Sequence, residues 1–133
     1  LKMHEGFRSK PYRDTVGKLT IGCGRNLDDR GISEAEAEHL LRNDIAEAET
    51  ELALRLPFWG SLDEARKAVL IDMTVNMGIG GLMGFKKTLQ FIKAGWYGAA
   101  SDEMLASKWA TQVGNRAQHL SRIMRDGRAD VVG

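Results

Sequence analysis

Two carboxyl groups and a hydroxyl group lie within sixteen positions near the start of this 133-residue chain. Glu5 falls at the end of a predicted helix, Asp14 in a predicted turn and Thr20 on a predicted strand. Burial in a cleft raises the pKa of a carboxyl group and preserves its proton, whereas a carboxylate in a polar turn stays ionised. Glycoside hydrolysis needs one carboxyl group of each kind, and a nearby hydroxyl such as that of Thr20 can orient a water molecule.

The same three residue types are common in purely structural roles. Glu5 as a solvated surface residue, Asp14 as a turn former and Thr20 as a strand former would explain the spacing equally well. The spacing alone therefore leaves a catalytic and a structural interpretation open.

The elements that must position these residues are short. Residues 1–9 are expected to contain the end of a helix before Pro11, residues 14–17 a hairpin turn, and residues 18–22 a strand. Glycines interrupt this segment repeatedly, which favours turns over long regular elements. We expect residues 6–33 to form a small β-hairpin lobe.

A long acidic helix is predicted next. Ser33 and Glu36 have the spacing of a capping box, and Pro57 marks the end of the helix. The apolar residues between them recur at helical spacing: Leu41, Ile45, Ala48 and Leu52. Residues 34–56 would then form a helix of about 22 residues, long enough to bridge two lobes.

The remainder, residues 57–133, is predicted to be a helical lobe. Ser61 and Glu64 form a second capping box that opens a buried helix to about Met77, followed by a flexible glycine-rich turn. Shorter helices are expected at residues 85–94, 98–106 and 115–126, with a loop at 111–114. We expect a single domain over residues 1–133, of the α+β class and predominantly helical, with the N-terminal helix packed on the helical lobe.

The charge and hydropathy of the chain argue against a nucleic-acid-binding module and a membrane-spanning protein. The formal net charge is +1, although residues 1–32 carry +3, residues 33–56 carry −5 and residues 57–133 carry +3. The arginines of residues 115–125 permit an alternative interpretation as a DNA-recognition helix, but nucleic-acid modules usually carry a clear positive excess. We therefore expect no nucleic-acid partner.

The chain has no apolar run of 18 residues and no signal-peptide pattern at its start, so neither a membrane span nor an export signal is visible.

The longer pattern around the three candidate residues resembles the phage-type lysozymes, the endolysin muramidases of tailed bacteriophages. It reads Glu5-Gly6, Tyr12, Asp14, Gly17 and Thr20-Ile21-Gly22-x-Gly24, with the Glu, Asp and Thr at the family's offsets of nine and six. The resemblance continues through residues 62–68, 76–78, 84–85 and 109–117, in the family's order. It implies a lysozyme-like two-lobe fold in which a long helix bridges the β-hairpin lobe and the helical lobe.

The resemblance also implies roles for particular residues. Glu5 would be the general acid, Asp14 the second carboxylate and Thr20 the residue that positions water. The substrate would be the β-1,4 bond between N-acetylmuramic acid and N-acetylglucosamine in peptidoglycan, cleaved with inversion, and the result would be bacterial lysis. No metal and no organic cofactor would be needed.

Four further residues are implied to contact substrate or to support the site. Arg116 matches the family's Arg that approaches the catalytic Glu, and Asn26 belongs to the small lobe. Asn76 and Thr88 match the neighbourhood where the large lobe contacts substrate; a helix C-terminal cap and an exposed helix position, respectively, are the alternatives. Cys23 is expected to be a buried or half-buried, inert thiol.

The partner implied by the resemblance is the peptidoglycan glycan strand, and we expect a monomer. The site of action would be the cell wall in the periplasm, after synthesis in the cytoplasm of the host bacterium. A binding module with the same fold and no turnover is the main competing hypothesis. The presence of all three catalytic residue types favours an enzyme.

Overall fold

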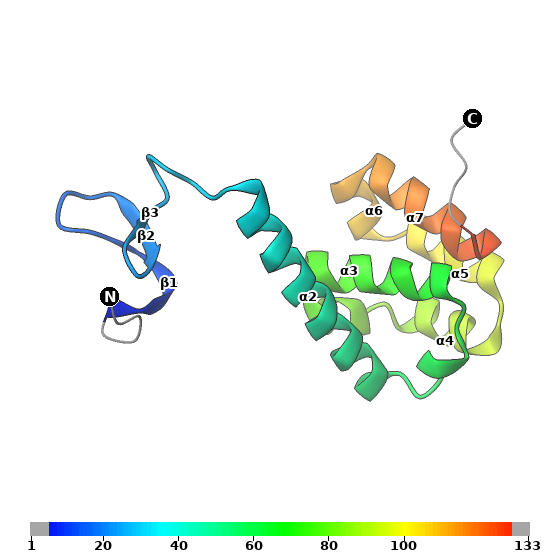
Figure 1. The fold of residues 1–133 in the computed structure, drawn as a ribbon. Coiled ribbons are helices and arrows are strands. Elements are labelled where there is room, and N and C mark those ends of the chain that lie inside the picture. The colour runs from blue at the N-terminus through cyan, green and yellow to red at the C-terminus, as the bar shows by residue number, and fades with distance from the viewer. Residues whose placement is uncertain (1–5, 129–133) are drawn as a thin grey trace. The chain divides into compact units, whose positions relative to one another are not determined.

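The computed structural model describes residues 6–128, and the chain divides into two compact units, residues 1–42 and 43–133. The first unit holds a small antiparallel sheet and the second is helical (Figure 1). A long helix, α2 (Glu34–Arg55), begins in the first unit and continues into the second. The predicted class, α+β and predominantly helical, is confirmed.

The sheet has three strands in the order β1-β2-β3: β1 (Arg8–Arg13), β2 (Leu19–Gly22) and β3 (Arg25–Asn26). The predicted turn and strand are confirmed. The expected helix is wrong at residues 8 and 9, where β1 has already begun, although Gly6 is helical. Pro11 fits this strand because β1 lies at the edge of the sheet, where a missing N–H is tolerated, and its pairing with β2 is irregular between Arg8 and Tyr12.

The capping box at the start of α2 forms as predicted. The Glu36 backbone N–H donates to Ser33 Oγ at 3.1 Å, and the Ser33 backbone N–H donates to Glu36 Oε1 at 2.9 Å. The same carboxylate binds the Arg25 guanidinium at 2.7–2.8 Å, and Arg25 also donates to the Gly31 carbonyl at 3.2 Å. Glu36 therefore joins the end of the sheet to the first turn of the long helix.

The next elements are a short 3-10 helix, η1 (Trp59–Ser61), and the helix α3 (Glu64–Met83). The predicted Ser61–Glu64 capping box is wrong. Asp63 caps α3 by accepting from the Arg66 N–H, and Ser61 Oγ instead donates to the Phe58 carbonyl at 2.7 Å. Both residue types are good caps, and the chain reaches Asp63 in the extended conformation that a cap requires.

The glycine-rich stretch at residues 78–84, the C-terminal part of α3, is more helical than expected. Only Gly78 leaves helical geometry, with φ 81° and ψ 161°, and the chain then resumes a helical path to Met83. The break near Met77 is thus confirmed, whereas the predicted flexible turn after it is wrong. A residue with a side chain would be strained at this φ, so Gly78 is the position that requires glycine.

Four shorter helices complete the fold: α4 (Lys86–Ala94), α5 (Tyr97–Leu105), α6 (Lys108–Val113) and α7 (Asn115–Asp126). The predicted loop at residues 111–114 is wrong for its first three positions, which belong to α6. Ser107 caps α6 by accepting from the Ala110 N–H, and Gly114 ends it. Figure 1 shows α3 to α7 packed together in the second unit. They enclose one hydrophobic core whose most buried side chains include Leu52, Leu70, Met73, Met104 and Met124.

No single helix within residues 6–128 is long and apolar enough to cross a membrane. Helices α3 and α4 would pass such a test only as a pair, and they are bent by 101° at their junction.

One arginine joins the two ends of the helical unit. Arg66, in the first turn of α3, donates from Nε to the Met124 carbonyl at 2.6 Å and from Nη2 to the Arg125 carbonyl at 2.9 Å. Its Nη1 pairs with Asp63 at 3.0 Å, and its guanidinium lies 3.4 Å from the centre of the Tyr97 ring. The side chain is only 13% exposed, so these contacts are poorly screened by water. The last carbonyls of α7, which have no partner within the helix, are satisfied by Arg66.

Replacement of Arg66 by Met should destabilise the fold by about 2–4 kcal/mol, because it leaves two helix-end carbonyls without their donor and Asp63 Oδ1 without its ion-pair partner. Arg42→Met is the matched control, since Arg42 is exposed and lies 3.9 Å from its partner Glu38. The control should cost less than about 0.5 kcal/mol. Urea unfolding of both variants measures the difference, and equal losses would contradict the role assigned to Arg66.

Glu36 should make stability depend on pH in a defined window. The hydrogen bond from Arg25 and those from Ser33 lower the pKa of the Glu36 carboxyl from 4.5 to about 2. Because the folded pKa is the lower one, the contribution is fully present above the unfolded pKa and is lost as pH falls through the folded one. The melting temperature of Glu36→Gln should therefore lie below that of the wild type at pH 6 and converge with it between pH 4.5 and 2. A constant difference across this range would contradict the assignment.

Candidate active site

Two of the candidate residues, Asp14 and Thr20, bind the backbone of the same residue, Lys18. Asp14 Oδ1 accepts the backbone N–H of Lys18 at 2.8 Å and that of Val16 at 3.0 Å. Thr20 Oγ1 donates to the Lys18 carbonyl at 2.8 Å. The Lys18 residue thus binds the carboxylate with its N–H and the hydroxyl with its carbonyl, which fixes both functional groups to the β1–β2 hairpin.

These contacts determine which atoms remain for chemistry. The single proton of the Thr20 hydroxyl is already donated, so its oxygen is left as an acceptor. Asp14 Oδ1 is used in the turn, while Oδ2 has no hydrogen bond that the described part of the chain supplies. The hairpin therefore presents two acceptor oxygens, one from each residue, and Thr20 itself is only 4% exposed.

Asn26 lies opposite Thr20 in the register of β2 and β3. Its side chain is engaged in the following turn: Nδ2 donates to Asp29 Oδ2 and Oδ1 accepts the Asp29 N–H, both at 3.0 Å. Asp28, in the same turn, accepts the Leu19 N–H at 2.7 Å. The Asn26 side chain thus holds the turn that follows β3.

Cys23 is exposed, which contradicts the expectation of a buried or half-buried thiol. It lies between Gly22 and Gly24, whose positive φ angles of 69° and 94° form the turn between β2 and β3. A residue at the tip of a tight turn has few neighbours to cover it.

Glu5, the candidate general acid, lies outside the described residues. The other three candidates belong to the helical unit. Asn76 is exposed on α3, two residues before the break at Gly78. Arg116, on α7, donates from Nε to Asp72 Oδ1 at 2.9 Å and from Nη2 to the same oxygen. Asp72 lies one helical turn before Asn76 on α3, so Asn76, Asp72 and Arg116 belong to one surface of this unit.

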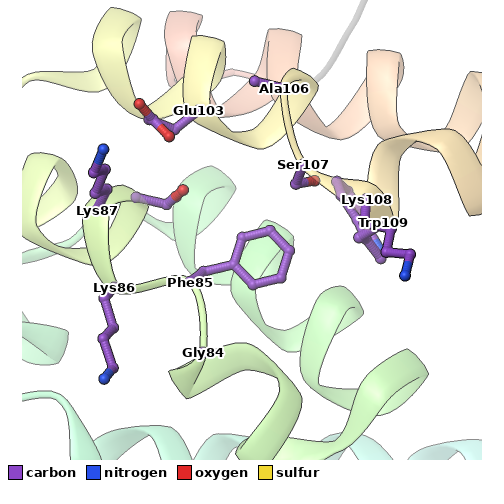
Figure 2. Close-up of a pocket in the computed structure, with 10 residues that line it drawn as sticks. Gly84, Phe85, Lys86, Lys87, Glu103, Ala106, Ser107, Lys108 and Trp109 are labelled. Carbon is purple, nitrogen blue, oxygen red and sulfur yellow. The ribbon is translucent and has the colours of Figure 1, made fainter.

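Thr88 is buried, with an exposure of 3%, so the alternative of an exposed helix position is wrong. It lines a pocket of about 360 Å³ between the start of α4 and the α5–α6 connection. Figure 2 shows Phe85 projecting between the α4 side, with Lys86 and Lys87, and the α6 side, with Lys108 and Trp109. The lining residues are Gly84, Phe85, Lys86, Lys87, Thr88, Glu103, Ala106, Ser107, Lys108 and Trp109.

The pocket is suited to an anionic ligand with an apolar part. Three lysines line it against one glutamate. No side chain caps the N-terminus of α4, so its first backbone N–H groups add positive character. Phe85 meets the buried Trp109 ring edge to face at 5.9 Å and supplies the apolar wall. The Trp109 indole N–H is buried without a hydrogen-bond partner among the described residues.

Sequence reasoning missed the partners that hold the candidate residues. The role of Lys18 rests on its backbone, which no sequence pattern marks. Asp72 could have been found, because it precedes Asn76 by four positions and so shares its helix face. Within residues 6–128, no three His, Cys, Asp or Glu side chains are grouped so as to hold a metal ion.

Comparison with known proteins finds similarity over nearly the whole chain. The family model described as "Phage lysozyme" matches residues 2–126. "Probable T4-type lysozyme 1" of Dictyostelium discoideum is 27% identical, over 96% of this chain and 92% of the relative. "Endolysin" of Bacillus phage B103 is 32% identical, over 82% of this chain and 42% of the relative. "Pre-baseplate central spike protein Gp5" of Enterobacteria phage T4 is 26% identical, over all of this chain and 28% of that protein.

Proposed function

The chain belongs to the phage lysozyme family and is a peptidoglycan-hydrolysing lysozyme, and we propose that Glu5, Asp14 and Thr20 carry out its reaction. The bond cleaved is the β-1,4 linkage between N-acetylmuramic acid and N-acetylglucosamine. The chain acts as a monomer on glycan strands in the periplasm, and cleavage leads to lysis of the bacterium.

The observation that carries the proposal is the pair of acceptor oxygens on the hairpin. Because Thr20 donates its proton to Lys18 and Asp14 Oδ1 is used in the turn, Thr20 Oγ1 and Asp14 Oδ2 remain to accept both protons of one water molecule. That arrangement leaves a lone pair of the water oxygen for attack on the anomeric carbon. Asp14 then takes the proton that the water loses.

Glu5 is the proton donor of the same step. It protonates the glycosidic oxygen as the bond to the anomeric carbon breaks, so the leaving sugar departs as a neutral alcohol. Attack by water on the face opposite the leaving group inverts the anomeric configuration. Arg116 supports Glu5, and Asn76 and Asn26 border the bound glycan.

The pocket behind Thr88 suits the peptide stems that peptidoglycan carries on its muramic acid residues. These stems bear carboxylates, which the lysines and the uncapped start of α4 would bind, and aliphatic side chains, which the Phe85 wall would contact. The pocket would then contribute to substrate binding and leave the bond-breaking step unchanged.

Glu5→Gln should lower the release of soluble fragments from purified peptidoglycan by about 10²–10⁴-fold, because the amide cannot donate the required proton. Asp14→Asn should also lower it, and Glu38→Gln is the matched control because Glu38 is an exposed acid of the same unit. Proton NMR of the first product formed by the wild type should show the α-anomer. Full activity of Glu5→Gln would refute the role of Glu5, a retained β-anomer would refute water attack, and absence of turnover in the wild type would indicate a binding module.

Replacing Lys86, Lys87 and Lys108 together by Gln should raise KM several-fold on peptide-bearing glycan, since three exposed charge contacts are worth about 1 kcal/mol in total. The kcat should stay the same, and KM on glycan stripped of its peptides should not change. Lys93→Gln serves as a control, because Lys93 lies in the last turn of α4, outside the pocket. An equal rise in KM on both substrates would contradict peptide recognition.

A further inference from the structure

Leu19, the residue directly before Thr20, is bound to the chain around the end of β3 by an irregular pair of hydrogen bonds. Its carbonyl accepts the Leu27 N–H at 2.7 Å, as in an antiparallel ladder. In a regular ladder the Leu19 N–H would in turn donate to the Leu27 carbonyl, but that carbonyl accepts the Gly31 N–H at 3.1 Å. The Leu19 N–H donates instead to Asp28 Oδ2 at 2.7 Å. A side-chain carboxylate thus takes the place of a backbone acceptor.

The Leu19 N–H belongs to the same planar peptide group as the Lys18 carbonyl, to which Thr20 is bound. This carbonyl accepts the Thr20 hydroxyl at 2.8 Å and the Asp14 backbone N–H at 2.9 Å, so both of its lone pairs are used. Asp28 holds the other end of the group. A hydrogen bond to a charged acceptor is stronger than one between neutral groups, and it polarises the peptide so that its carbonyl accepts more strongly.

We propose that Asp28 is a positioning residue for the lysozyme reaction: it holds the peptide between Lys18 and Leu19 in the orientation whose carbonyl takes the Thr20 proton. This inference rests on the proposed function, in which the Thr20 oxygen is left as an acceptor for the attacking water. Asp28 itself touches neither the water nor the substrate. Without its carboxylate the peptide group is held at the carbonyl end only, and the hydroxyl can turn its proton toward the water.

The other contact of Asp28 is weaker. Arg13 Nη1 lies 3.4 Å from Asp28 Oδ2, and the two side chains are 66% and 41% exposed. Exposed ion pairs of this kind contribute little. Arg13→Gln, which removes the ion pair and keeps the bond to Leu19, should therefore retain a kcat within two-fold of the wild type. A loss as large as that of Asp28→Ala would overturn the assignment of the role to the Leu19 bond.

The first test is Asp28→Ala, measured as kcat and KM for soluble-fragment release at a temperature well below the melting point of each variant. Loss of the positioning group should lower kcat about ten-fold and leave KM within two-fold of the wild type. Asp28→Asn keeps a neutral acceptor oxygen and should recover part of the lost kcat. Glu38→Gln is the matched control, because it removes the same charge from an exposed acid of the same unit. Wild-type kcat in Asp28→Ala would overturn the inference.

The second test asks whether Asp28 acts through Thr20. In a Thr20→Ala background there is no hydroxyl left to orient, so Asp28→Ala should lower kcat by less than two-fold. A role in stability alone would lower the melting temperature and leave the effects on kcat additive. A ten-fold loss of kcat in both backgrounds would therefore contradict positioning.

The Thr20→Ala variant by itself separates the inference from the proposed function. If Thr20→Ala is slow and Asp28→Ala is as active as the wild type, only the role of Asp28 fails. If Thr20→Ala keeps the wild-type kcat, the proposed role of Thr20 fails, and the inference about Asp28 fails with it.

Discussion

The packing of α3 against α7 is the constraint on which the helical unit depends. Arg66 joins the first turn of α3 to the last carbonyls of α7, and Asp72 joins the middle of α3 to the first turn of α7. The two helices therefore run antiparallel with a polar contact near each end of α7. Between these contacts the helices are held by apolar packing, to which Leu70, Met73 and Leu120 contribute. The Arg116–Asp72 ion pair and the hydrogen bonds from Arg66 to the α7 carbonyls fix the register of this helix contact.

Gly127 shows how tightly the end of α7 is fitted. Its φ of 71° ends the helix, and a Cβ atom added there would lie 2.6 Å from Arg66 Nη1. Glycine is therefore required at this position twice, for its backbone conformation and for the room that Arg66 occupies. The same guanidinium covers the Tyr97 ring, so one side chain connects α3, α5 and α7. A lysine in its place would lack the planar fork that reaches several acceptors at once.

The sequence predicts those elements whose signals are local. The Ser33–Glu36 capping box, the turn at Asp14 and the break at Gly78 each depend on residues a few positions apart, and each forms. The errors arise where two local signals compete. Ser61 and Asp63 are both good helix caps, and the choice between them depends on Arg66, which closes the Asp63 cap while it binds the far end of α7. A contact over 58 positions cannot be read from local propensity.

In the candidate site, too, local sequence signals mark the residues, whereas their contacts depend on the folded chain. The types and offsets of Asp14 and Thr20 mark them in the sequence, but the atoms they leave available depend on the Lys18 backbone, which becomes evident only once the hairpin is formed. The local pattern around Thr88 allows an exposed helix position, whereas in the fold Thr88 is buried and lines the pocket that the α5–α6 connection also lines. Glu36 likewise serves a predicted cap and an unpredicted contact with Arg25.

A consequence of this arrangement is that each unit orders its own candidate residues. Asp14 and Thr20 are fixed by the backbone of Lys18, which lies between them in the sequence, and Arg116 is fixed by Asp72 within the helical unit. Each of these contacts lies within one unit of the chain. These contacts restrict the rotamers of Asp14, Thr20 and Arg116 before any substrate binds. Substitutions within one unit should then be nearly additive in free energy with those in the other, provided that the substituted residues share no partner.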